Sequence, residues 1–139
     1  MKNYNEYKMN LIIKNIKWVM MISGALTATM FYGLFAPQAA VESMFGTSFS
    51  GPLETLIIRS WSSLVGVIGL VLLYGAFNER NRVFCISIAA LSKVIFVSLV
   101  LIYGQEFLVT AAPAITMDCL VILLTLSFLV SVRVQRPPA

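Results

Sequence analysis

The chain has 139 residues, of which 59% are hydrophobic and 12% are charged, and its mean hydropathy is +0.88. Soluble globular proteins carry roughly a quarter charged residues, so this composition excludes an ordinary soluble domain and indicates an integral membrane protein. The length suits one domain of several membrane spans, and despite a net charge of +4 no motif supports nucleic-acid binding.

The first 17 residues, MKNYNEYKMNLIIKNIK, combine apolar side chains with lysines and asparagines at helical spacing. This pattern is typical of an amphipathic helix on an anionic membrane surface. The simpler alternative is a cytoplasmic extension of the first membrane helix. We therefore predict that residues 1–17 form a cytoplasmic or interfacial segment before the membrane domain.

Four apolar segments follow, each close to the roughly 20 residues that cross a hydrocarbon core. In lipid the backbone polar groups must be satisfied within each segment, so each is predicted to be a helix. The first is predicted to be retained, because its apolar run is longer than that of a signal peptide. We predict an all-α membrane protein with a four-helix transmembrane domain over residues 18–132, its spans at about 18–35, 53–77, 83–103 and 107–132.

The basic residues outside these spans indicate the orientation. They lie before the first span, between the second and third, and after the fourth: Lys2, Lys8, Lys14, Lys17, Arg80, Arg82, Arg133 and Arg136. By the positive-inside rule, both termini, the NERNR loop and the tail at 133–139 face the cytoplasm. The predicted location is the cytoplasmic (inner) membrane, with a multi-pass topology.

One connection, between the first two spans, is long. Pro37 can begin a short helix and Gly46 can end it, so that its apolar residues lie against the membrane or cap the bundle: Val41, Met44 and Phe45. Glu54 then falls in the first turn of the second span, where the helix dipole favours an anion. The loop could act as a binding lid, or it could simply join two helices that are not tight neighbours.

Besides Glu54 in the first turn of the second span, three charged residues fall deeper within the spans: Arg59, Lys93 and Asp118. An isolated charge at the bilayer centre costs at least about 2.5–3.5 kcal/mol, so each needs compensation. Lys93 is ten residues from Tyr103, which places it roughly 15 Å deep. Asp118 reaches a similar depth if the fourth helix begins near residue 107, but only about 7 Å if it begins at Pro113.

These charges, together with Glu54, sum to zero, as a low-dielectric interior requires. We predict an Arg59–Asp118–Lys93 network that faces the bundle interior. Small and polar residues at helical spacing around Arg59 indicate either close helix packing or a water-filled cavity. Trp61 lies about two turns inside the second span, away from the aromatic belts. The candidate ligand-binding or ion-network residues are Arg59, Lys93, Asp118, Glu54, Ser62, Ser63 and Trp61.

Several chemistries are excluded by composition. The chain has no histidine, which removes His-ligated haem, the common zinc sites and a histidine general base. No phosphate-binding glycine loop is present, and Gly66 and Gly69 are better explained by helix packing. We predict neither catalytic nor metal-binding residues. The charged network could be an ionic staple, a path for protons or ions, an anion or lipid head-group site at Arg59, or part of a quinone site.

Two stretches, GLFAPQAAVESMFG and RSWSSLVGVIGLVLLYGAF, together with SKVIF, LVLIYG and TMDCL, resemble small bacterial four-helix membrane proteins of unknown function that are loosely DoxX-like. The resemblance covers roughly residues 18–130 and implies the same four-helix architecture. Some DoxX proteins are linked to thiosulfate or quinone oxidation. Because this chain has no redox motif, the resemblance does not imply that activity here.

The function we expect is that of a non-enzymatic inner-membrane protein with a structural, accessory or binding role, which works in the lipid bilayer as a homo-oligomer or within a larger complex. No cofactor is predicted, with quinone or lipid as the candidate small molecules. The alternatives are a small proton-linked or anion transporter and a quinone-linked membrane enzyme.

Overall fold

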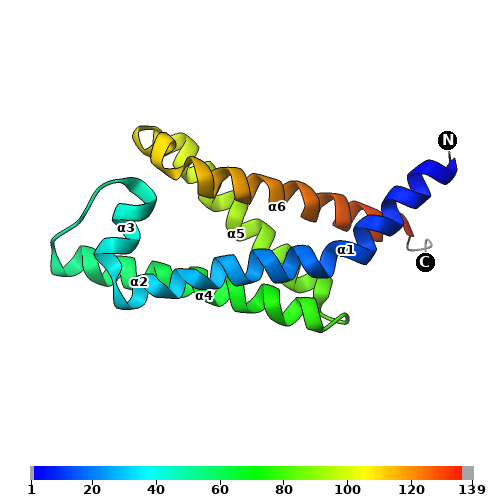
Figure 1. Ribbon diagram of the computed structural model, residues 1–139, viewed down its shortest axis with the longest axis horizontal. Coiled ribbons are helices and arrows are strands. Elements are labelled where there is room, and N and C mark those ends of the chain that lie inside the picture. The colour runs from blue at the N-terminus through cyan, green and yellow to red at the C-terminus, as the bar shows by residue number, and fades with distance from the viewer. Residues whose placement is uncertain (1, 136–139) are drawn as a thin grey trace.

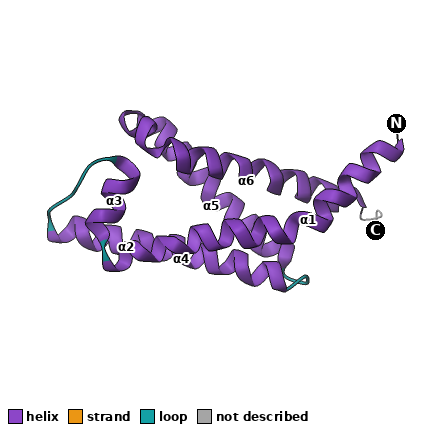
Figure 2. Cartoon of the chain, in the orientation of Figure 1, coloured by secondary structure: helices purple, strands orange, loops and turns teal. Residues whose placement is uncertain are grey.

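The computed structural model describes residues 2–135, and over this range it contains helices and short connections only (Figure 2). Residue 1, the end of the predicted tail at 136–139 and the side chains of the predicted amphipathic segment before Lys14 lie outside the described part. The elements are α1 (Lys2–Ala28), the 3₁₀ turn η1 (Thr29–Phe31), α2 (Tyr32–Phe35), α3 (Pro37–Phe45), α4 (Pro52–Phe77), α5 (Arg82–Tyr103), the 3₁₀ turn η2 (Gln105–Phe107) and α6 (Leu108–Gln135).

The predicted all-α fold with four membrane-spanning helices is confirmed. Four helical stretches are long and apolar enough to cross a bilayer: Lys14–Phe35, Pro52–Phe77, Arg82–Tyr103 and Gln105–Val134. The first and last extend beyond the predicted limits, because α1 runs unbroken from Lys2 and α6 continues to Gln135. Residues 2–17 are therefore continuous with the first membrane helix.

The four long helices form an elongated bundle (Figure 1). Helices α1 and α4 lie side by side, and α5 crosses obliquely from the end of α4 to the start of α6. Both chain ends and the α4–α5 connection lie at one end, which we call the termini end. Helix α3 and the α5–α6 connection lie at the opposite end, which we call the α3 end.

Helices α1 and α4 pack closely because glycines meet at their contact. A Cβ atom added to Gly69 would lie 2.3 Å from the backbone nitrogen of Ala28, and one added to Gly24 would lie 3.0 Å from the carbonyl oxygen of Gly69. Gly66 is covered in the same way by the ring of Phe31. The small residues of α4 thus serve helix approach, the first of the two predicted alternatives.

The termini end holds the main apolar core and a tightly bonded turn. Large buried side chains from all four long helices meet there: Ile16, Met20, Leu72, Ile86 and Phe128. Arg82 donates hydrogen bonds to the carbonyl oxygens of Gly75 (3.3 Å) and Ala76 (3.2 Å), which are left free at the end of α4. This arginine therefore ties the start of α5 to the end of α4.

Helix α3 has the limits predicted from its proline and glycine. Pro37 is the first helical residue, and Gly46 ends the helix in a left-handed conformation (φ 68°), which glycine adopts without steric cost. Val41 is only 2% exposed, so α3 caps the bundle. Pro113 lies inside α6, which begins at Leu108, so the fourth helix starts before this proline.

The α1–α4 contact can be tested by adding one methyl group at Gly69. The Gly69→Ala protein should lose about 1–3 kcal/mol of stability, because the new Cβ overlaps the backbone of Ala28 and the helices must separate. Thermal unfolding of the purified protein in detergent measures this loss. Gly51→Ala is the matched control, since the three atoms nearest to its new Cβ belong to the carboxylate of Glu54, an exposed side chain that can turn away. Equal stability of the two variants would contradict the packing described.

Candidate functional site

A buried ion pair joins the third and fourth spans. Lys93, in the middle of α5, is 8% exposed, and its ammonium group contacts the carboxylate of Asp118 on α6. The lysine also donates a hydrogen bond to the hydroxyl of Thr27 on α1, at 3.4 Å. The pair predicted from depth is present in the structure, and Thr27 extends it to a third helix.

The helical repeat explains why both charges point inward. On α5 the buried residues recur every three or four positions, and Lys93 belongs to that stripe: Cys85, Ile86, Ala89, Ala90, Lys93, Val97 and Val100. On α6, Asp118 lies seven residues from Ala111 and seven from Thr125, each 1% exposed, and so shares their face.

The electrostatics of the pair favour its persistence. Charges in a low-dielectric interior are tolerated when they are paired and hydrogen-bonded, and Lys93 and Asp118 are neutral together. The side chain of Lys93 is 9% exposed and that of Asp118 is 17% exposed. Both side chains are thus largely shielded, and that of Lys93 more so than that of Asp118.

The prediction that Arg59 joins Lys93 and Asp118 in a three-residue network is wrong. Arg59 is exposed on α4 and makes no salt bridge within the described residues. Ile57 and Trp61, which line the side of α4 facing α5, each lie two residues from Arg59 and hence about 200° around the helix. The prediction compared depths only, and the direction of Arg59 around α4 turns it away from the pair.

The remaining predicted candidates lie elsewhere. Glu54 is in the first turn of α4, as predicted, but is exposed at the α3 end. The hydroxyl of Ser63 donates to the carbonyl oxygen of Arg59 at 2.7 Å, a bond within α4. Ser62 is fully buried against Gly33, and its hydroxyl has no hydrogen-bond partner among the residues that the structure describes. None of these three contacts Lys93 or Asp118.

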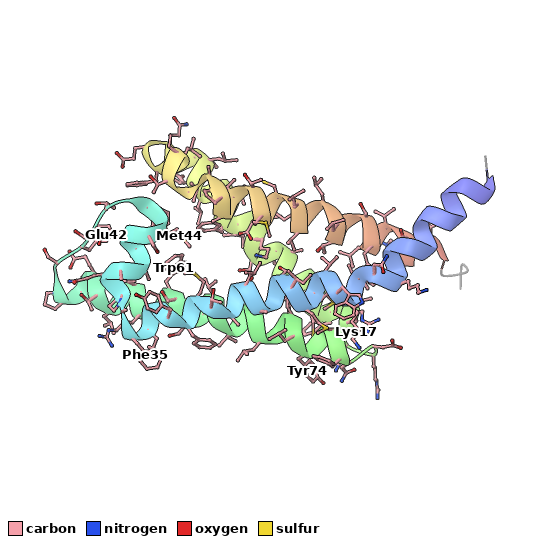
Figure 3. The ribbon with its side chains drawn as sticks, viewed as in Figure 1. Lys17, Phe35, Glu42, Met44, Trp61 and Tyr74 are labelled. Atoms are coloured by element: carbon pink, nitrogen blue, oxygen red, sulfur yellow. The ribbon has the colours of Figure 1, made fainter. Side chains whose placement is uncertain are left out.

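An apolar pocket of about 340 Å³ lies at the α3 end, between α3, α4 and α5. Among its lining residues, only Trp61 was a predicted site residue, and Figure 3 shows Trp61 beneath α3. The pocket is lined by Val41, Phe45, Phe49, Ile57, Ile58, Trp61, Phe96, Leu99, Val100, Tyr103 and Gly104. The signal that could have indicated it is the row of aromatic residues at 45, 49 and 61, all near the same end of the bundle.

Comparison with known proteins gives no match: no family model fits the chain, and no curated protein or solved structure is similar to it. The candidate sites therefore rest on the geometry described above.

The ion pair can be tested by a double-mutant cycle. Lys93→Met and Asp118→Leu should each destabilise the bundle by about 3–5 kcal/mol, because each leaves one buried charge unpaired. The double variant should recover part of that loss, giving a coupling energy above about 1 kcal/mol in detergent unfolding experiments. Arg59→Gln, which removes an exposed and unpaired charge, is the control and should change stability by less than about 0.5 kcal/mol. Additive losses in the double variant would show that the two residues are not coupled.

A substitution at Ser62 tests whether its buried hydroxyl only packs against its neighbours or has a binding partner. Replacing Ser62 with alanine removes a buried hydroxyl that has no hydrogen-bond partner, so stability should stay constant or rise by up to about 1 kcal/mol. Ser131→Ala is the comparison, because that buried hydroxyl donates to the carbonyl oxygen of Ser127 at 2.7 Å and should cost about 0.5–1 kcal/mol. Both values come from thermal unfolding. A marked loss in Ser62→Ala alone would indicate a partner for that hydroxyl.

Proposed function

We propose that this protein is a non-enzymatic, multi-pass membrane protein with a structural or accessory role, in which Lys93 and Asp118 hold the bundle in one register. The observation that carries the proposal is that the two charged groups packed inside the bundle, Lys93 and Asp118, compensate each other. Lys93 satisfies Asp118 on α6 and reaches Thr27 on α1, so a single side chain connects three helices. Arg59, by contrast, adds no further charge to this centre.

The proposed location is the inner membrane, with both termini in the cytoplasm. In support, both chain ends and the α4–α5 connection lie at the same end of the bundle (Figure 1). Five described basic residues belong to these segments: Lys14, Lys17, Arg80, Arg82 and Arg133. The carboxylates of Glu42, Glu54 and Glu106 belong to segments at the α3 end. Such an asymmetry is what the positive-inside rule expects of a cytoplasmic termini end.

An accessory role implies contact with other chains, either further copies or a larger membrane complex. In support, many large apolar side chains on α6 are exposed, among them Leu120, Leu123 and Val130. Lipid covers such a surface in an isolated bundle, and a neighbouring membrane helix fits it equally well. The resemblance to DoxX-like proteins, and quinone or lipid as a small-molecule ligand, stay predictions of the sequence.

A proton-linked or anion transporter is the second candidate. The observation that favours it is the presence of two ionisable side chains, Lys93 and Asp118, within the membrane-spanning helices, because such groups are common in proton and ion pathways. The Thr27 hydroxyl beside Lys93 would add a further polar group to such a path.

Flux measurements separate the two candidates. Wild-type protein and Asp118→Asn, which keeps the shape of the side chain and removes its charge, are reconstituted in liposomes that contain a pH-sensitive dye. We expect equal, background-level proton and chloride flux from both, because the structural proposal requires no path through the pair. A wild-type flux well above that of protein-free liposomes, lost in Asp118→Asn, would overturn the structural proposal in favour of transport.

A further inference from the structure

The pocket at the α3 end is separate from the ion pair and is built by three helices. Neither Lys93 nor Asp118 lines it. Its volume of about 340 Å³ lies within the usual range for small-molecule sites, about 300–1,000 Å³. Phe96 is its lining residue closest along α5 to Lys93, one helical turn away, and the charge of that lysine is already compensated by Asp118.

Aromatic rings form much of the wall and one of them holds α3 in place. Five lining residues are aromatic: Phe45, Phe49, Trp61, Phe96 and Tyr103. The ring of Phe45 packs against Trp61 with centroids 6.1 Å apart, and against Phe107 with centroids 5.7 Å apart in an edge-to-face arrangement. These contacts join α3 to α4 and to η2, so the pocket is preformed rather than dependent on closure of a loose loop.

Three glutamates lie within four residues along the chain of residues that line the pocket. Glu54 precedes Ile57 and Ile58 by three and four residues, so it lies on the same face of α4, one turn nearer the α3 end. Glu42 follows Val41 on α3, and Glu106 comes two residues after Gly104. Arg59, the basic residue nearest on α4, directly follows Ile58, but it is exposed and lies about 200° around the helix from Trp61. No basic side chain lines the pocket.

We infer that this pocket binds a bulky hydrophobic cation, such as an aromatic or quaternary ammonium or phosphonium compound. Aromatic faces attract cations, and the attraction strengthens when the ion is desolvated. The nearby carboxylates add an attraction that acts over several ångströms. The same charges repel an anionic lipid head group, and a neutral alkyl chain gains nothing from them. The chemistry of the wall and of its surroundings thus favours a cation over either alternative.

The test measures binding of radiolabelled tetraphenylphosphonium to the full chain in dodecyl maltoside micelles, with protein-free micelles as the blank. We expect saturable binding at one site per chain, and at least about tenfold weaker binding of tetraphenylborate, an anion of the same shape. In a Trp18→Phe variant, Trp61 is the only tryptophan, and its fluorescence should change over the same concentration range.

Variants then separate the aromatic and the charged contributions. Trp61→Leu should weaken tetraphenylphosphonium binding about tenfold through lost cation–π contact. Tyr103→Leu should weaken it in the same direction without disturbing the fold, because Tyr103 is 80% exposed. Glu54→Gln should weaken it about threefold, whereas Glu79→Gln, which removes an exposed carboxylate at the termini end, should leave it unchanged.

Three results would overturn the inference. The first is non-saturable binding of tetraphenylphosphonium, and the second is equal affinity for the cation and the anion. The third is a pocket occupied by a co-purified neutral lipid, or by a second copy of the chain, that tetraphenylphosphonium does not displace. The flux experiment on Asp118 does not involve these residues, so a failure of either proposal is distinguishable from a failure of the other.

Discussion

The contact between Lys93 and Asp118 governs how the rest of the bundle is arranged. A lysine in the middle of a membrane helix is tolerated only if its charge is compensated, and the nearest compensation lies on a different helix. Helices α5 and α6 must therefore keep the rotation and the height that bring these side chains together. The bond to Thr27 brings α1 into the same constraint. A shift of α5 or α6 by one turn, about 5.4 Å, would leave a buried charge unpaired, and a similar shift of α1 would remove the hydrogen bond to Thr27.

The two ends of the bundle use different physical means to hold the helices together. At the termini end, large apolar side chains from all four long helices interlock, and Arg82 closes the turn between α4 and α5. At the α3 end, α3 and the aromatic packing of Phe45 close the bundle around a pocket. Figure 3 shows the contrast, with Lys17 and Tyr74 at the first end and Trp61 and Met44 at the second. The proposed binding pocket therefore lies at the end away from the main apolar core.

Much of the fold was predictable from local patterns. The four apolar stretches, the short helix between Pro37 and Gly46 and the acidic first turn at Glu54 each depend on neighbouring residues only. Of the site, the pairing of Lys93 with Asp118 was predictable because depth follows from residue counting along a helix. The start of the fourth helix before Pro113 was not, since proline is common both at a helix start and inside membrane helices.

The prediction for Arg59 was wrong, and the pocket was not predicted, for the same reason. Residue counting gives the depth of a side chain in the membrane. It does not say which neighbouring helix that side chain faces, because the packing of the bundle decides where the neighbouring helices lie. Gly24 and Gly69 set how closely α1 and α4 approach, and this fixes which side of α4 faces α5. With that side occupied by Ile57 and Trp61, Arg59 points away.

The sequence by itself thus determined the class of protein, the number of spans and the need for a neutral centre, because hydrophobicity, length and charge are properties of each segment. Only the tertiary structure decided which charged residues form an ion pair, which residues line a pocket and which glycines lie at the contact between two helices. These depend on the rotation of each helix against the others, and that rotation follows from the simultaneous packing of residues far apart in the chain, such as Thr27, Lys93 and Asp118.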